Sequence, residues 1–284
     1  IVACGSAYHA GVVAQYVIED LAKIPVRVEL ASEFRYRKPL LDPDVLVVVI
    51  SQSDETADSL AALRLAKDKG LKTLGIVNVV GSSIAREADN VFYTLAGPEI
   101  AVATTKAYST QLIAAYCLAL QFAYVRGEME LSEYERFLSE LETIPEKIEK
   151  ILEDKERILW FAAKVANSKD IGLSKEDILK KLEDKLNISL QKAQEYLVMF
   201  GKQTSFEGSL KLKEISYIHS EAYAAGELKH GTISLIEDNI LVIGVLTQSE
   251  LYEKTVSNMV ECKSRGAYLC GLTTYGKYEV EDTV

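Results

Sequence analysis

Histidine and cysteine are scarce in this chain of 284 residues, which holds three histidines and four cysteines. The cysteines, Cys4, Cys117, Cys262 and Cys270, form no CxxC pair, and three histidines are too few for a histidine-rich metal centre. Scattered cysteines of this kind are typical of a reducing compartment. We therefore expect a cytoplasmic protein that uses no metal.

Positive charge and long apolar runs are also in short supply. Lys and Arg number 32 against 42 Asp and Glu, which gives a formal net charge of −10. Nucleic-acid binders need clustered Lys and Arg for phosphate contacts, so this charge balance argues against that class. No apolar run reaches the roughly 18 residues of a membrane span. The hydrophobic fraction of 48% is enough for a buried core, and the length allows two domains.

Strand-like and helix-like patterns alternate through the first 126 residues. Residues 45–50 and 71–77 are nearly continuous apolar runs, typical of strands that are covered on both faces of a parallel sheet. Residues 10–22, 56–69 and 105–125 have helical spacing, and Lys69-Gly70 indicates a helix end. The alternation predicts an α/β fold with a parallel sheet.

Residues 127–196 are predicted to be a helical linker. The composition changes over residues 128–168, where Glu and Lys are dense and Leu and Ile recur at three- and four-residue spacing. Within it, residues 170–196 read as an unusual inserted segment. A second helical pattern begins at Asn187 and competes with a strand over residues 197–200, and periodicity alone leaves both open.

An internal repeat is the most informative feature of the chain. Residues 47–53 resemble residues 243–249 at an offset of 247 − 51 = 196, and residues 1–5 can be set against 197–201 at the same offset. Residues 31–33 resemble 219–221 at an offset of 188. We therefore expect a first subdomain over 1–126, the linker over 127–196, and a second, C-terminally truncated subdomain over 197–284. The abrupt start also suggests a piece of a longer protein.

Small hydroxyl side chains gather where two predicted strands end. One group is Cys4-Gly5-Ser6, and the other is Ser51-Gln52-Ser53, followed by Thr56 near a helix start. Ligands of open α/β sheets bind at these strand ends, and hydroxyls beside a helix N-terminus suit a phosphate monoester. The alternative is that Ser53 or Asp54 simply caps the helix. No P-loop or dinucleotide-binding glycine motif is present.

A second cluster of reactive side chains lies within residues 211–231. Lys211 and Glu214 are three residues apart and share a helix face, and His230 lies in a predicted loop. Such a set offers an imine former or oxyanion stabiliser, a base that moves protons, and an acid for ring opening. The plainer interpretation is a surface ion pair, with His219, among apolar residues, as a core histidine.

Residues 211–231 closely resemble the isomerase (double SIS) domain of the glutamine–fructose-6-phosphate aminotransferases, the glucosamine-6-phosphate synthases. The first copy agrees at Ala3-Cys4-Gly5, 31–37, Ser51-Gln52-Ser53, 55–58, Gly81-Ser82-Ser83 and 103–107. The resemblance covers about residues 1–168 and 206–274. It implies two SIS-type three-layer αβα subdomains with parallel sheets, the second incomplete, joined by helices.

The same resemblance implies an activity and a role for each candidate residue. Fructose 6-phosphate and ammonia would become glucosamine 6-phosphate in hexosamine biosynthesis, without a cofactor, and an N-terminal glutaminase domain would supply the ammonia. Glu214 would move a proton between C1 and C2, Lys211 would line the site, and His230 would open the sugar ring across a homodimer interface. The sugar phosphate would be held by Ser6, Ser51, Gln52, Ser53 and Thr56.

Two other functions remain open. Ala7 and Asp54 stand where the family usually has Ser and Gly, and the C-terminal lysine that forms an imine with the sugar has no counterpart here. These departures suit a non-catalytic sugar-phosphate-binding module. A related deglycase or deaminase acting on amino-sugar phosphates would differ only in its substrate.

Overall fold

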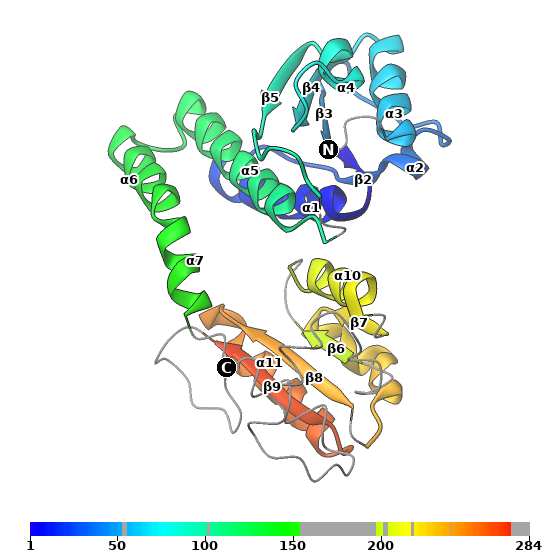
Figure 1. Ribbon diagram of the computed structural model, residues 1–284, viewed down its shortest axis with the longest axis vertical. Helices are drawn as coiled ribbons and strands as arrows, with labels where there is room; N and C mark the ends of the chain where they lie inside the picture. The colour runs from blue at the N-terminus through cyan, green and yellow to red at the C-terminus, as the bar shows by residue number, and fades with distance from the viewer. Residues whose placement is uncertain are drawn as a thin grey trace. The chain divides into compact units, whose positions relative to one another are not determined.

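The computed structural model describes residues 1–52, 56–100, 103–153, 197–200, 204–216, 219–238 and 240–273. The chain forms two compact units, Ile1–Ile144 and Pro145–Val284, and each is described by itself. Each unit holds a parallel sheet with helices on its faces (Figure 1). No helix within the described ranges has both the length and the apolar character needed to cross a membrane.

The first unit is a five-stranded parallel sheet in the order β2-β1-β3-β4-β5. The chain runs from β1 outward to the edge strand β2 and then returns to β3 on the other side of β1. The strand order therefore reverses between β1 and β3, which is where ligands of such sheets bind. The strands are β1 (Val2–Ala3), β2 (Glu29–Leu30), β3 (Leu46–Ser51), β4 (Lys72–Val77) and β5 (Asn90–Tyr93). The helices are α1 (Gly5–Ala22), α2 (Ala31–Phe34), α3 (Ala57–Asp68), α4 (Ser83–Glu87), α5 (Thr105–Arg126) and α6 (Leu131–Glu142), and α7 (Ile144–Leu152) follows.

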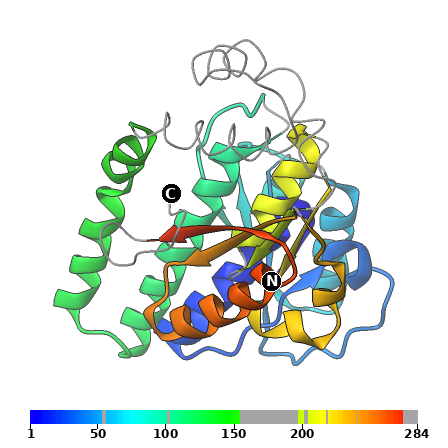
Figure 2. The same cartoon turned by 90° about the horizontal axis from the view of Figure 1, so that it is seen from below.

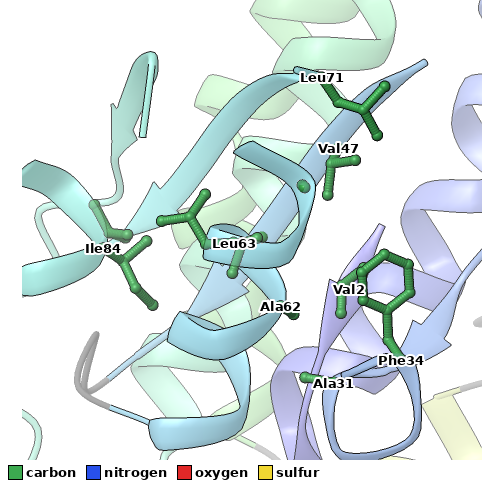
Figure 3. Close-up of a cluster of buried hydrophobic side chains, with 11 residues drawn as sticks. Val2, Ala31, Phe34, Val47, Ala62, Leu63, Leu71 and Ile84 are labelled. Atoms are coloured by element: carbon green, nitrogen blue, oxygen red, sulfur yellow. The ribbon is translucent and has the colours of Figure 1, made fainter. Parts of the chain in front are cut away.

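Alternating residues of β3 belong to two core clusters, one on each face of the sheet. Val47 and Val49 join a cluster with Leu63 of α3 and Ile84 of α4, and Figure 3 shows this cluster. Val48 and Ile50 pack on the opposite face with residues of α1 and α5, which lie side by side in Figure 1. Full burial of Leu63 stabilises the fold by roughly 1.5–3 kcal/mol. The continuous β-branched run therefore produced the strand covered on both faces that the sequence predicted.

The second unit repeats this plan with four parallel strands in the order β7-β6-β8-β9. Leu212 of α10 packs with Leu241 and Ile243 on one face. Residues of α11 and η1 pack on the other, and Figure 2 shows α11 beside β8 and β9. The elements are β6 (Leu197–Phe200), α10 (Thr204–Ser216), β7 (Ser220–Tyr223), η1 (Ala225–His230), η2 (Thr232–Leu235), β8 (Leu241–Leu246), α11 (Ser249–Lys263) and β9 (Tyr268–Thr273).

The shared strand order confirms the internal repeat, with one correction. In both sheets the first strand pairs with the second and third, and the fourth joins the third. The described part of the second sheet has no counterpart of β5. Residues 31–33 belong to α2, whereas Ser220 and Glu221 belong to β7. The match at offset 188 therefore joins different elements of the two copies and is wrong.

The predicted elements are present, with shifted ends. The first helix begins at Gly5 rather than at residue 10, so Ser6 lies in its first turn. α3 ends as predicted at Lys69-Gly70, because Gly70 adopts φ +75 and its N–H donates to the carbonyl of Lys67. Residues 197–200 form a strand, which decides against the competing helix. α6 and α7 lie in the predicted linker, and its residues 154–196, including the segment 170–196, fall outside the described residues.

Candidate functional site

Two helix N-termini meet the carboxyl edge of the first sheet at the point where the strand order reverses. Ala3 of β1 lies opposite Ile50 of β3, so these strands are neighbours. α1 begins directly after β1, and α3 is the next helix after β3. Gly5 adopts φ +55, a backbone conformation that favours glycine, where the chain turns from β1 into α1. Both helices present backbone N–H groups at this edge, which suits an anion.

The predicted phosphate-binding residues all belong to this unit. Ser51 ends β3 and is buried, and Gln52 follows it. The side-chain oxygen Oε1 of Gln52 is buried and accepts no hydrogen bond from the residues that the structure describes. Ser6 is half-buried in the first turn of α1. Thr56 is the N-cap residue of α3, so the alternative that placed Ser53 or Asp54 at the cap is wrong; both residues lie outside the described ranges.

Asn78, which follows β4, anchors the segment that leaves β5. Its Oδ1 accepts hydrogen bonds from the backbone N–H of Ala96 at 2.7 Å and from the hydroxyl of Thr94 at 3.2 Å. Its Nδ2 donates to the carbonyl of Gly97 at 2.8 Å. Sequence reasoning missed this residue, although a buried strand followed by Asn is a signal that could have found it. Asn78 therefore fixes the backbone of residues 94–97 relative to the end of β4.

Lys211 and Glu214 come together on α10 as predicted, and Glu207 joins them. The Nζ of Lys211 lies 2.6 Å from Oε2 of Glu214 and 3.4 Å from Oε1 of Glu207. The side chains of Lys211 and Glu207 are only 14% and 7% exposed, and that of Glu214 is 31% exposed. The pair is therefore not a plain surface ion pair. Sequence reasoning missed Glu207, which the four-residue spacing to Lys211 could have revealed.

The two histidines of this region differ from their predicted settings. His219 is not a core residue: its side chain is 47% exposed, and Nε2 lies 3.2 Å from Oε1 of Glu221. His230 is exposed and ends the 3₁₀ helix η1 instead of lying in an irregular loop. Leu228 of η1 is fully buried against residues of α11, which fixes the segment that carries His230. In the described parts of the chain, no three His, Cys, Asp or Glu residues are grouped to hold a metal ion.

The sequence pattern of the SIS domain matches residues 1–121 and 201–278. The chain belongs to the SIS domain family. The first matched segment contains the whole first sheet, and the second contains β7, β8 and β9 of the second sheet, which β6 precedes at Leu197–Phe200. All candidate site residues fall inside the matched segments.

Relatives with known names show which SIS proteins this chain is similar to in sequence. It is 51% identical over 284 residues to glutamine–fructose-6-phosphate aminotransferase (isomerizing) of Caldanaerobacter subterraneus subsp. tengcongensis. It is 52% identical over 289 residues to the protein of that name from Clostridium tetani. Both matches include 100% of this chain but only 43% of the relative's length. The chain thus spans less than half of these relatives.

Solved structures agree with these relatives. The C-terminal domain of glucosamine-fructose-6-phosphate aminotransferase from Francisella tularensis matches with a TM-score of 0.80 and 36% identity, over 100% of this chain and 75% of that one. Glucosamine-6-phosphate deaminase from Thermotoga maritima matches with a TM-score of 0.71 and 24% identity, over 97% of this chain and 75% of that one, which shows the fold alone. The resemblance to the isomerase domain of the aminotransferases is confirmed.

Proposed function

We propose that this chain is the isomerase module of a glutamine–fructose-6-phosphate transaminase (isomerizing). It converts fructose 6-phosphate and ammonia into glucosamine 6-phosphate and water. The observation that carries the proposal is the largely buried group of Glu207, Lys211 and Glu214 on α10. Bringing three charged side chains into a largely buried setting costs desolvation free energy even when they are paired, so the arrangement favours a catalytic role over a non-catalytic module.

Glu214 is the base in this proposal. Ammonia adds to C2 of the open-chain ketose, and water leaves to form an imine. Glu214 then takes a proton from C1 and returns it to C2, while the proton of the C1 hydroxyl passes to nitrogen as the aldehyde forms. The ion pair with Lys211 fixes Oε2 of Glu214 and thereby orients the carboxylate.

Lys211 stabilises charge in this proposal and does not form an imine. Attack on a carbonyl requires a neutral amine, and an ammonium ion that bridges two carboxylates is poorly suited to it. The same ammonium is well suited to an oxygen that gains negative charge when C1 is deprotonated. Of the two roles that the sequence left open for Lys211, imine formation and oxyanion stabilisation, its setting favours oxyanion stabilisation.

The sugar phosphate binds at the carboxyl edge of the first sheet in this proposal. Ser6, Ser51, Gln52 and Thr56 lie at the start of α1, the end of β3 and the start of α3, and Ser53 belongs to the same motif. Hydroxyls and helix N-termini can bind a phosphate dianion although the chain carries a net charge of −10. The sugar ring is opened by His230, which a second copy of the chain contributes in a homodimer.

The surrounding protein and its location complete the proposal. A glutaminase domain elsewhere in the full-length protein supplies ammonia, which the greater length of the relatives supports. The four cysteines are free, and this supports a cytoplasmic location.

The test uses the full-length protein that carries this chain, with fructose 6-phosphate and either glutamine or ammonium chloride. We expect Glu214→Gln to lower kcat by about 10²–10⁴-fold while calorimetry shows fructose 6-phosphate binding within about twofold of wild type. Glu221→Gln is the matched control, because Glu221 pairs with the exposed His219. Full activity of the Glu214→Gln variant would overturn the role of Glu214.

The open alternatives predict different outcomes of the same experiment. Wild-type protein that binds fructose 6-phosphate but forms no product from either nitrogen donor would establish the non-catalytic module instead. Release of ammonia from glucosamine 6-phosphate as the dominant reaction would establish a deaminase. Absence of binding to both sugar phosphates would end the proposal in every form.

A further inference from the structure

An ion pair joins the end of α2 to the first turn of α3. Nη1 of Arg35 donates to Oδ1 of Asp58 at 2.6 Å, and the two side chains are 30% and 34% exposed. Arg35 is the C-cap residue of α2, and its neighbour Phe34 is buried in the cluster that also contains Ala62 of α3. The packing of α2 against α3 therefore holds the guanidinium beside Asp58.

Asp58 lies in the first turn of α3, where its negative charge would act on an anion bound at the helix N-terminus. It lies two residues after the N-cap Thr56, which is an axial rise of only about 3 Å. A carboxylate in the first turn stabilises a helix, but it does so by using the positive end that a bound phosphate would also use. A phosphate at the start of α3 would therefore be repelled by an uncompensated Asp58. The sequence adds Asp54 and Glu55 just before this helix.

We propose that Arg35 is a positioning residue that binds the Asp58 carboxylate and so allows the N-terminus of α3 to accept a sugar phosphate. The inference rests on the proposed function, in which Thr56 and the end of β3 hold that phosphate. Arg35 acts through Asp58 and needs no contact with the ligand. The hydrogen bond to Asp58 also raises the pKa of Arg35, which agrees with a firmly held guanidinium.

A second ion pair in the same region provides the matched control. Arg37, two residues further on, forms two hydrogen bonds with the carboxylate of Glu29. Glu29 belongs to the edge strand β2 and not to the start of α3. A general contribution of arginine charge to ligand attraction would affect both arginines alike, whereas the proposal concerns Arg35 alone.

The experiment measures binding of glucosamine 6-phosphate by calorimetry to the full-length protein, at about 20 mM and about 500 mM salt. We expect Arg35→Gln to weaken binding about tenfold at low salt, with a smaller effect at high salt. We expect Asp58→Asn to bind as tightly as wild type or more tightly. The double variant should recover most of the affinity lost in Arg35→Gln, and Arg37→Gln should match wild type.

A merely structural ion pair gives the opposite pattern. Asp58→Asn would then weaken binding as much as Arg35→Gln, because both break the pair, and the double variant would show no recovery. That pattern would overturn the inference, as would equal binding by Arg35→Gln and wild type. In both cases wild-type binding persists and the proposed function stands. If wild type binds neither sugar phosphate, the proposed function and this inference fall together. Thermal melting confirms that each variant is folded before titration.

Discussion

The side-chain oxygen Oδ1 of Asn78 accepts a hydrogen bond of 2.7 Å from the backbone N–H of Ala96. The preceding residue Val77 lies directly opposite Ser51, the last residue of β3. Asn78 therefore ties the segment after β5 to the part of the carboxyl edge where the phosphate is proposed to bind. The backbone of Leu95 in this segment adopts φ +52, a value that residues other than glycine adopt only where the surrounding structure constrains them.

Replacing Asn78 by Asp tests this anchor. The variant keeps the oxygen that faces Ala96 but replaces the Nδ2 donor by a second oxygen facing the carbonyl of Gly97. We expect a stability loss of about 1–3 kcal/mol and a raised KM for fructose 6-phosphate with a smaller change in kcat. Thermal melting and steady-state kinetics measure both. Asn90→Asp, at an exposed position of β5, is the control, and wild-type KM and stability in the Asn78→Asp variant would contradict the prediction.

Glu207 is expected to support catalysis by holding Lys211. Glu207→Gln keeps the size of the side chain but removes one of the two negative charges beside the ammonium of Lys211. We expect kcat to fall about tenfold or more, with fructose 6-phosphate affinity nearly unchanged. Kinetics with ammonium chloride as nitrogen donor isolate this step from glutamine hydrolysis. The control is Lys213→Gln, an exposed position of the same helix. Unchanged kcat in the Glu207→Gln variant would show that Glu214 alone positions Lys211.

The strands and the Lys211–Glu214 pair were predictable because each depends on residues that are near in sequence. The β-branched run of β3 and the three-residue spacing on α10 carry their own signals. Asn78 itself carries a local signal, because it follows a buried strand, but its partners were not predictable, because they lie 16 to 19 residues away in an irregular segment without periodicity. Arg35 and Asp58 are likewise 23 residues apart, and only the packing of α2 on α3 joins them.

His219 shows how local composition misleads. Its apolar neighbours suggested a core position, but strand side chains alternate between the two faces of a sheet. Ser220 and Ala222 are buried, whereas Glu221 and the preceding His219 are more exposed. The period of two, rather than the average polarity of the stretch, decides which side chains are covered.

Stability at low pH is expected to depend on Asp89. Hydrogen bonds from the Thr73 hydroxyl at 2.9 Å and from its backbone N–H at 2.8 Å lower the pKa of the Asp89 carboxyl. A lowered pKa in the folded state means that this stabilisation is present above the unfolded value of about 3.9 and is lost as pH falls through the folded value. Asp89→Asn should therefore lower Tm at pH 7, and the difference from wild type should shrink below about pH 4. A pH-independent difference would contradict this account. Thr73→Ser, which keeps both donors, serves as the control.

Donation of His230 by a second copy predicts recovery of activity when two inactive variants are mixed. His230→Ala lacks the residue proposed to open the sugar ring but keeps Glu214, and Glu214→Gln has the reverse defect. If the working site combines residues of two copies, reassociated mixed dimers hold one complete site, and an equal mixture should regain about a quarter of wild-type activity. Glucosamine 6-phosphate formation after dissociation and reassociation measures this. A mixture of His230→Ala with the double variant lacking both residues is the control and should stay inactive, because no pairing of its subunits supplies His230. If each copy uses its own His230, no mixture regains activity and the proposed sharing is wrong.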